Sequence, residues 1–432
     1  MEKRISRKIT VILAVLLVVF AIGGNGTASI VKASEQQVRN VIFMIPDGFS
    51  SAYATNYRLY KGKESIMDSM LVGMHRTNSA NSAVTDSAAA GTAMATGVKT
   101  NNGMISMSPD GKKLRTILQA SKSAGKSAGL VATSTITYAT PAVFASHVTS
   151  RANEAEIAPQ YLENDVDVLL GGGKKYFPDQ LLNQAKEDGY RIVFERKGLT
   201  YARKSKKLLG LFSEEGMAAE LDRKRTKEPS LVEMTEMALN ILSQNKKGFF
   251  VMIEGSQIDW AGHANDPAWA MKDIEAFEQA VEKAVDFAKK DKHTLVVIAG
   301  DHDNGGMSVG GYGEYAAKID LLRQVKATGN YMATQLNEDK SNIKEVVKKY
   351  TAIDLADEEV KKIKAASVPS MAINEVVSKR ALVGWTTNQH TGVDIPVYAF
   401  GPGSELFKGL IDNTDLPKRM AKAMNIQLIQ GK

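Results

Sequence analysis

The sequence predicts an α/β fold, built as a three-layer α/β/α sandwich around a large, mostly parallel sheet. Apolar runs of strand length, at 38–45, 249–253 and 294–298, alternate along the chain with segments of helical pattern. Each of these three runs is followed within three residues by an acidic side chain. Open α/β sheets place their ligand-binding groups at the carboxyl ends of such strands. With 432 residues, the chain is long enough for one large domain with insertions.

The first 33 residues have the pattern of a signal peptide. Four basic residues within the first eight precede 9–22, which is apolar except for Thr10. This run is too short for a typical membrane span and suits the apolar core of a signal peptide. Val31-Lys32-Ala33 favours cleavage after Ala33, with cleavage after Ala28 or a retained signal anchor as alternatives. We expect an exported protein that meets the membrane only transiently.

The composition narrows the possible partners and sites. The chain has no cysteine, which excludes disulfides, thiolate zinc ligands and a lipoprotein anchor. Cleavage after Ala33 would remove five cations and one acid, lowering the formal net charge from +7 to +3. The sequence pI of about 9.1 therefore reflects mainly the targeting segment. No dense basic patch interleaved with aromatic residues is present, so we expect no nucleic-acid partner.

The remaining elements are predicted in chain order from pattern and punctuation. A helix is expected to begin near Ser87 and a loop to follow it at 97–103. Residues 180–246 are expected to be helical with charged, solvated faces. Residues 307–383 begin with a glycine-rich stretch and continue with charged helical patterns, and we expect them to form an insertion that caps the sheet. Further strands are predicted at 127–133, 165–170 and 395–400, the last strand of the chain, and further helices at 114–124, 274–289, 342–350 and 357–366.

The segment from Val84 to Ala93 places an acid and a hydroxyl directly before a run of small, helix-forming residues. If the helix begins near Ser87, the free N–H groups of its first turn surround the serine oxygen. The helix dipole then favours negative charge at that oxygen, as a nucleophile requires. The alternative is an ordinary N-cap, because serine and aspartate are common before alanine-rich helices.

Acids and histidines gather at the predicted strand ends. Imidazole and carboxylate ligands without sulfur suit zinc in an open catalytic site, whereas an oxygen-only group suits magnesium. Two zinc ions about 4 Å apart can act on both the attacking and the leaving oxygen of a displacement. The candidate ligands are Asp47, Glu254, Asp301 and His302 at strand ends, Asp259 and His263 four apart on a helix, and His390 on a loop.

Taken in this order, the motifs make the sequence resemble the bacterial secreted alkaline phosphatases, which are metal-dependent and use a serine nucleophile. The resemblance runs from Asp47 to Gly403. Its motifs are Pro46-Asp47-Gly48, Thr85-Asp86-Ser87-Ala88-Ala89, Ala139-Thr140-Pro141, His147-Val148-Thr149-Ser150-Arg151, Glu254-Gly255, Asp259 with His263, Asp301-His302 and His390-Thr391-Gly392.

The resemblance implies two Zn²⁺ and one Mg²⁺ per subunit, a homodimer and phosphate scavenging. It implies hydrolysis of small phosphate monoesters through a covalent phosphoserine on Ser87. Arg151 would bind two phosphate oxygens, with Asp86 orienting it. The implied ligands are Asp259, His263 and His390 for the first zinc, Asp47, Asp301 and His302 for the second, and Asp47, Thr140 and Glu254 for magnesium.

Two residues depart from the family pattern. Tyr138 stands two residues before Thr140, where an aspartate or histidine is usual, which leaves the affinity and identity of the third metal open. Trp260 follows Asp259 where some members have a lysine, so the substrate site lacks that charge.

Two rival functions fit the same motifs in part. One is another enzyme of the same superfamily: a phosphodiesterase, a sulfatase or a phosphomutase. Arg151 together with Asp86-Ser87 favours a dianionic monoester, and a sulfatase would need a modifiable residue in a different motif. The other rival is a non-catalytic secreted protein that binds the same metals for structure.

Replacing Trp260 with lysine is expected to tighten inhibition by inorganic phosphate, because a cation near the site attracts the dianionic product. The measurement is the phosphate inhibition constant of the wild type and of Trp260→Lys. An identical constant in the two proteins would refute the expectation.

Overall fold

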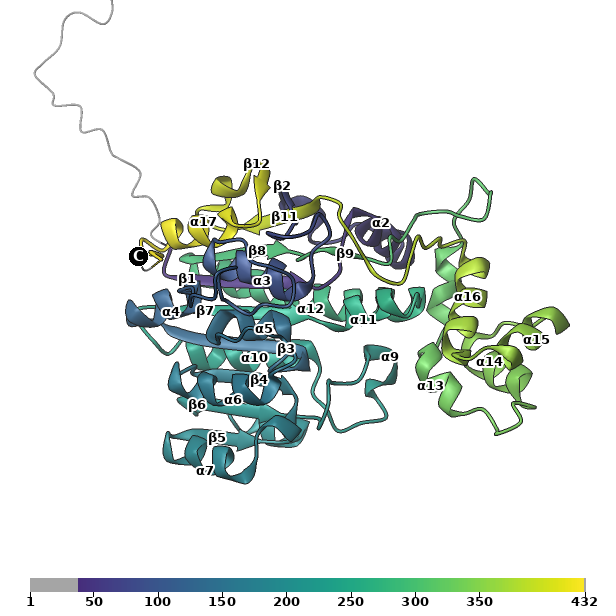
Figure 1. Ribbon diagram of the computed structural model, residues 1–432, viewed down its shortest axis with the longest axis horizontal. Helices are drawn as coiled ribbons and strands as arrows, with labels where there is room; N and C mark the ends of the chain where they lie inside the picture. Colours follow the sequence, from purple (N-terminus) through teal and green to yellow (C-terminus); the bar gives the residue numbers. More distant parts are fainter. Residues whose placement is uncertain (1–37, 431–432) are drawn as a thin grey trace, which may run out of the picture. The chain divides into compact units, whose positions relative to one another are not determined.

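One ten-stranded sheet organises residues 38–430, the part of the chain that the computed structural model describes (Figure 1). The predicted signal peptide lies outside the described residues. The strand order is β12-β2-β11-β8-β1-β7-β3-β4-β6-β5. The strands are β1 Asn40–Pro46, β2 Leu71–Arg76, β3 Ser127–Thr135, β4 Val168–Gly172, β5 Tyr190–Val193, β6 Lys207–Leu211, β7 Phe249–Gly255, β8 Thr294–Ala299, β11 Ile395–Phe400 and β12 Gly409–Asp412.

Neighbouring strands of this sheet pair in parallel, except that β11 is antiparallel to both β2 and β8. The predicted α/β class with a large, mostly parallel sheet is therefore confirmed. Central strands such as β1 are buried along their whole length, because helices cover both faces. This explains why the sequence shows β1 as a continuous apolar run and not as an alternating pattern.

Two apolar layers flank the sheet. Successive side chains of β1 point to opposite faces, so Ile42 and Met44 join one layer while Val41 and Phe43 join the other. The first layer contains α2 Ser51–Lys61, α10 Leu231–Leu242 and α12 Pro267–Asp291. The second contains α3 Ser87–Thr96, α4 Ile117–Ser123, α5 Ala139–Ala145, α6 Glu154–Glu163, α7 Asp179–Glu187 and α17 Asp415–Ala423.

The expectation that residues 180–246 are helical is wrong in part. Two strands, β5 and β6, lie among the helices α7, α8 Arg196–Thr200, α9 Glu220–Arg223 and α10. Both strands are short, and Arg191 of the edge strand β5 is exposed, so the charged residues around them hide the apolar signal.

The opposite edge of the sheet also differs from the expectation. Residues 395–400 do form a strand, but β12 follows it, so it is not the last. Neither β2 nor β12 was predicted, because both carry exposed leucines, Leu71 and Leu410, and lack a continuous apolar run.

Residues 307–383 contain no strand and pack against α2 and α12. Figure 1 shows their helices to one side of the sheet, next to α11 Gln257–His263. Three hydrogen bonds join them to the turn after α11: Asn374 Nδ2 donates to the Ala264 carbonyl at 2.9 Å, Ser378 Oγ to the Asn265 carbonyl at 3.3 Å, and the Gly329 N–H to Asp266 Oδ2 at 2.9 Å. The elements are η3 Ile319–Gln324, α13 Gly329–Thr334, α14 Ile343–Thr351, α15 Asp357–Ala365 and α16 Pro369–Ala381.

Among the described residues, the helices are all too short or too polar to span a lipid bilayer.

Candidate active site

Three carboxylates meet where the adjacent strands β1, β7 and β8 end. The register pairs Ile45 of β1 with Glu254 of β7, so Asp47 and Glu254 emerge side by side at the same edge. Asp301 follows β8, the other neighbour of β1. Each of these carboxylates is at most 1% exposed. Parallel pairing thus concentrates negative charge in a space from which water is excluded.

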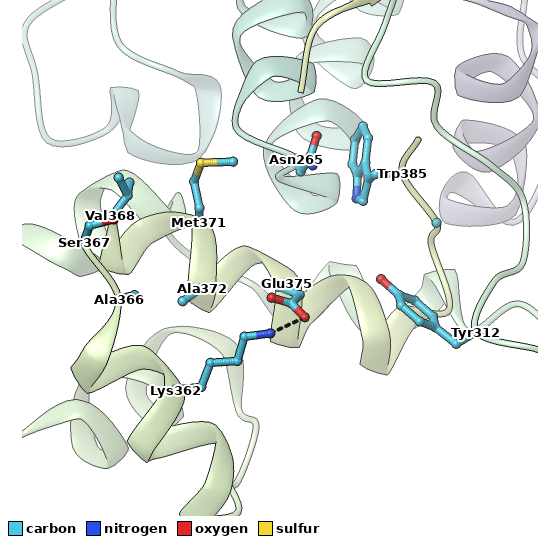
Figure 2. Close-up of a pocket in the computed structure, with 11 residues that line it drawn as sticks. Asn265, Tyr312, Lys362, Ala366, Ser367, Val368, Met371, Ala372, Glu375 and Trp385 are labelled. Carbon is cyan, nitrogen blue, oxygen red and sulfur yellow. Dashed lines mark hydrogen bonds and ion pairs between the residues drawn. The ribbon is translucent and has the colours of Figure 1, made fainter. Parts of the chain in front are cut away.

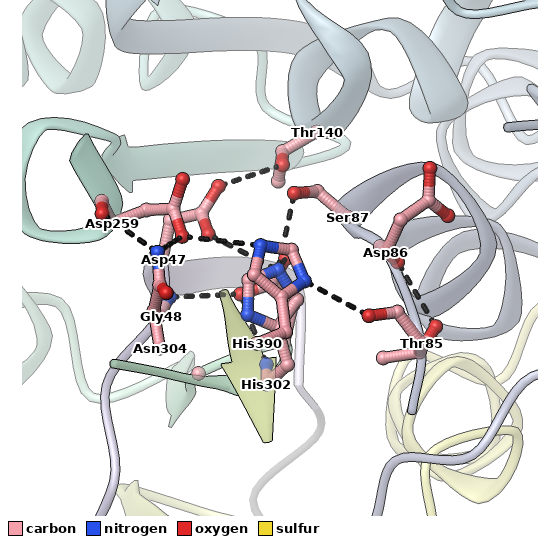
Figure 3. A network of polar contacts seen from close by, with 12 residues as sticks. Asp47, Gly48, Thr85, Asp86, Ser87, Thr140, Asp259, His302, Asn304 and His390 are labelled. Carbon is pink, nitrogen blue, oxygen red and sulfur yellow. Dashed lines mark hydrogen bonds and ion pairs between the residues drawn. The ribbon is translucent and has the colours of Figure 1, made fainter. Parts of the chain in front are cut away.

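Ser87 is the first residue of α3, and Asp86 is the N-cap. Asp86 Oδ1 accepts the N–H of Ala89 at 2.9 Å, which satisfies one of the free donors of the first turn. The capping role therefore falls to the aspartate and leaves the serine hydroxyl free for chemistry. Ser87 Oγ lies 3.1 Å from Nε2 of His302, and the serine is buried (Figure 3).

One group of possible ligands surrounds His302. Its Nε2 lies 3.5 Å from Asp47 Oδ1 and 3.1 Å from Asp301 Oδ2. Asp47, Asp301 and His302 each offer a ligand atom within 4.8 Å of the other two, and all three are buried. The imidazole nitrogen, two carboxylates and the Ser87 hydroxyl thus converge on one point.

A second group combines α11 with a short ribbon formed by β9 Asp303–Asn304 and β10 His390–Thr391. Nε2 of His390 lies 3.3 Å from Nε2 of His263 and 3.5 Å from Asp259 Oδ1, while His263 Nε2 lies 3.4 Å from Asp259 Oδ2. The His390 ring stacks on His302 with 3.6 Å between ring centroids. The two groups are therefore neighbours.

Backbone carbonyls fix the orientation of the two histidines in this second group. Nδ1 of His263 lies 2.8 Å from the Asn388 oxygen, and Nδ1 of His390 lies 2.9 Å from the Thr85 oxygen. A carbonyl only accepts, so each Nδ1 carries the proton. Each Nε2 then presents a lone pair, which is the arrangement of metal-ligating histidines.

A third group contains only oxygen. Thr140 Oγ1, in the first turn of α5, donates to Asp47 Oδ2 at 3.2 Å. Both carboxylate oxygens of Glu254 are buried without a hydrogen-bond partner, as is Asp47 Oδ1. Burial raises the pKa of Glu254 to about 8, and burial together with the charge of Asp301 raises the pKa of Asp47 well above its usual range. These shifts mark a cluster that lacks positive charge.

Arg151 is held at the open side of the site. Its Nη1 donates to Asp86 Oδ2 at 3.1 Å, and the same oxygen accepts the N–H of Gly103 at 3.0 Å. The guanidinium carbon lies 4.9 Å from the centre of the Tyr138 ring. Asp86 therefore links the start of the Ser87 helix to the arginine. Trp260 contacts Tyr138 and makes no direct contact with Arg151 among the interactions described.

Sequence reasoning did not assign a role to Asn304, although it stands two residues after His302. Its Nδ2 donates to Asp259 Oδ1 at 2.6 Å and to the Asp259 carbonyl at 2.8 Å. The neighbouring Asp303 accepts the Thr391 hydroxyl at 2.6 Å and so holds the ribbon that carries His390. The only signal was their place in the Asp301–Gly306 motif, because their partners lie far away in sequence.

A separate cavity of about 660 Å³ lies between the 307–383 insertion and the turn at 384–385. Figure 2 shows the Tyr312 and Trp385 side chains on one side of it and α16 along its floor, with Lys362 and Glu375 paired at 2.6 Å. None of the predicted catalytic residues or ligands lines this cavity.

The chain is similar in sequence to known proteins over nearly its whole length. The family model described as alkaline phosphatase matches residues 38–426. Alkaline phosphatase 4 of Bacillus subtilis (strain 168) is 44% identical over 413 residues, which are 90% of this chain and 89% of that protein. Alkaline phosphatase 3 of the same organism is 42% identical over 425 residues, covering 92% and 91%.

Solved structures agree with the fold. The cold-active alkaline phosphatase of the psychrophile Shewanella sp. superposes with a TM-score of 0.85 at 36% identity, covering 89% of this chain and 99% of that one. The Thermus thermophilus alkaline phosphatase superposes with a TM-score of 0.86 at 29% identity, covering 95% of this chain and 97% of that one. The family match and these similarities show that the chain belongs to the alkaline phosphatase family and is a metal-dependent phosphatase of phosphate monoesters.

Proposed function

We propose that the chain hydrolyses phosphate monoesters through a covalent phosphoserine on Ser87, at a site for two Zn²⁺ and one Mg²⁺. The observation that carries this proposal is the place of Ser87. Its hydroxyl lies at the start of α3, 3.1 Å from the buried Nε2 of His302, and Asp86 beside it holds Arg151.

The residues present fit two zinc ions. Asp259, His263 and His390 offer two imidazole nitrogens and a carboxylate, and Asp47, Asp301 and His302 offer one nitrogen and two carboxylates. Nitrogen and oxygen donors in sets of three leave a coordination position open, as catalytic zinc sites do. The close approach of His263 and His390, with Nε2 atoms 3.3 Å apart and both Nδ1 atoms facing carbonyls, is explained by a shared cation.

The third group fits magnesium by its oxygen donors. Asp47, Thr140 and Glu254 present two carboxylates and a hydroxyl, and Glu254 has no hydrogen-bond partner for either oxygen. The Tyr138 side chain has no carboxylate or imidazole. The third metal site therefore lacks the aspartate or histidine that the family pattern places at this position.

The reaction we propose is a double displacement at phosphorus. In the first step Ser87 Oγ bonds to phosphorus while the bond from phosphorus to the ester oxygen breaks. The Ser87 hydroxyl loses one proton and the leaving oxygen gains one, so that the alcohol is released. In the second step a water oxygen bonds to phosphorus while the bond from phosphorus to Ser87 Oγ breaks. Oγ regains one proton and inorganic phosphate is released. Bound metal ions would supply Lewis-acid stabilisation of the attacking and leaving oxygens.

The chain's own residues position the phosphoryl group. Arg151 can donate two parallel hydrogen bonds to phosphate oxygens, since its planar guanidinium has only Asp86 as a hydrogen-bonded side-chain partner. The free N–H groups at the start of α3 add a positive dipole end beside Ser87. Both features favour a dianionic monoester over a monoanionic diester, and family membership leaves the non-catalytic alternative without support.

Names of relatives bear on the physiological role. The 31% identical protein of Saccharomyces cerevisiae is called repressible alkaline phosphatase. We further propose that this chain releases inorganic phosphate for scavenging. The 28% identical Streptomyces griseus protein is called streptomycin-6-phosphate phosphatase. The alternative role is therefore the hydrolysis of one particular phosphate monoester. We further propose export through residues 1–33, action outside the cytoplasm and a homodimer.

Ser87→Ala is expected to lower monoester hydrolysis at least about a thousandfold while the fold survives, because the nucleophile is lost. Turnover of p-nitrophenyl phosphate and the thermal unfolding midpoint are measured together. Ser123→Ala, an exposed serine of α4, is the matched control. Retained turnover in Ser87→Ala contradicts the phosphoserine.

A monoester is expected to be hydrolysed at least about a hundredfold faster than the matching diester, because the site is built around a dianion. The comparison is kcat/KM for p-nitrophenyl phosphate, bis-p-nitrophenyl phosphate and p-nitrophenyl sulfate on one preparation. A preference for the diester or the sulfate would establish the rival function.

The metal-free protein is expected to lose stability as pH rises from about 5 to 8. The folded chain holds the Glu254 proton up to a pKa of about 8, whereas the unfolded chain releases it near 4.5, so rising pH favours unfolding in this window. Unfolding midpoints are measured after chelation at several pH values. Glu254→Gln should flatten the slope, and Glu338→Gln, at an exposed position, should not. A midpoint that rises with pH in the chelated wild type rules this out.

A further inference from the structure

We propose that Tyr138 is a positioning residue for Arg151, and that Trp260 and Gly216 hold Tyr138 in place. This inference rests on the proposed function, because it assigns Arg151 to the substrate phosphate. It concerns how the arginine is oriented and not how the reaction proceeds.

Arg151 needs more than Asp86 to fix its orientation. Its backbone N–H donates to the Gly103 carbonyl at 2.8 Å, which anchors the main chain. In the side chain, a single nitrogen, Nη1, is hydrogen-bonded to Asp86. One such contact leaves the guanidinium plane free to rotate about it. A group on the face of the guanidinium restricts that rotation without occupying any N–H.

Tyr138 provides that face. The guanidinium carbon lies 4.9 Å from the ring centre, within the range of a cation–π contact. The tyrosine is the N-cap of α5 but makes no side-chain capping bond, so its ring is not used to stabilise the helix. Its backbone is fixed, because its N–H donates to Thr135 at 2.9 Å and its carbonyl accepts from Ala142 at 2.9 Å. The ring thus stands on a rigid base.

Trp260 packs against the same ring. The two rings meet edge to face, with 5.8 Å between centres and an interplanar angle of 84°. The far edge of the indole occupies the space above Gly216, where a Cβ atom would lie 2.2 Å from Trp260 Cη2 and 2.7 Å from Cζ3. Only glycine leaves room for this packing. A continuous chain of contacts therefore runs from Gly216 through Trp260 and Tyr138 to Arg151, which we call the aromatic support.

The rings of Tyr138 and Trp260, the two departures from the family pattern, pack against each other in this structure. In Trp260→Lys the loss of this packing opposes the gain from the added charge, so that variant does not test the aromatic support. The arginine keeps its free N–H groups for phosphate, because the ring contacts its face and accepts none of them.

The test compares Tyr138→Leu, which removes the π face, with Tyr138→Phe, which keeps it. The leucine variant is expected to lower kcat/KM for p-nitrophenyl phosphate about tenfold and to raise the inhibition constant of inorganic phosphate by a similar factor. The phenylalanine variant should stay within about twofold of wild type. Tyr331→Leu, which removes a ring 4.1 Å from Arg225 in another part of the molecule, is the matched control and should change neither constant.

A double-mutant cycle separates positioning from a structural effect. In an Arg151→Ala background, Tyr138→Leu should have no further effect on kcat/KM. Gly216→Ala, which displaces Trp260 and leaves Tyr138 in place, should change kcat/KM and phosphate inhibition in the same direction as the leucine variant. If Tyr138→Leu does not fold, Gly216→Ala replaces it in the double-mutant cycle with Arg151→Ala.

Four results would overturn the inference. These are wild-type constants in Tyr138→Leu, an equal loss in Tyr138→Phe, a loss that persists without Arg151, and full recovery of Tyr138→Leu in excess Mg²⁺. The last would mean that residue 138 acts through Thr140. Failure of the proposed function gives a different result, namely turnover that does not depend on Ser87.

Discussion

Repulsion among buried carboxylates is the constraint on which the rest of the site depends. Asp47, Glu254 and Asp301 lie at adjacent strand ends with almost no exposure, and Asp259 lies close enough to add to the field at Asp47. Burying ionised carboxylates without cations costs several kcal/mol each. The fold tolerates this arrangement because the sheet below it is large, rigid and apolar on both faces. The unsatisfied oxygens of Asp47 and Glu254 show where positive charge is needed.

Further candidate metal ligands reach the carboxylates from outside the sheet. α11 brings Asp259 and His263 on one helical face, and the β9–β10 ribbon brings His390 over His302. Carbonyls of Thr85 and Asn388 set which ring nitrogens face inward. Thr85 belongs to the segment that leads into the Ser87 helix, so Ser87, the proposed nucleophile, and His390, a predicted zinc ligand, are held by neighbouring residues.

The sequence was informative where a local pattern reflects a local cause. The central strands could be predicted from apolar runs, and the start of α3 from Asp86-Ser87 before small residues. The two outermost strands at each end of the sheet, β12 and β2 and then β6 and β5, could not. β2, β5 and β12 are partly exposed and lack such runs, and β6 is buried but only five residues long. For the site, sequence motifs placed the carboxylates at strand ends, and the resemblance supplied the grouping of ligands. The stacking of His390 on His302, the bond from Asn304 to Asp259 and the ring under Arg151 depend on long-range contacts that no local pattern records.

The hydrogen bonds between the 307–383 insertion and the turn after α11 have an evolutionary consequence. Asn374, Ser378 and Gly329 reach the backbone or side chains of Ala264, Asn265 and Asp266, immediately after His263. Substitutions in this region can therefore stiffen or relax the turn next to His263, a proposed zinc ligand, while the proposed catalytic residues stay unchanged. In relatives adapted to colder or hotter habitats, substitutions there can change the rigidity of the turn, and with it the turnover rate, without altering a residue proposed to take part in the reaction.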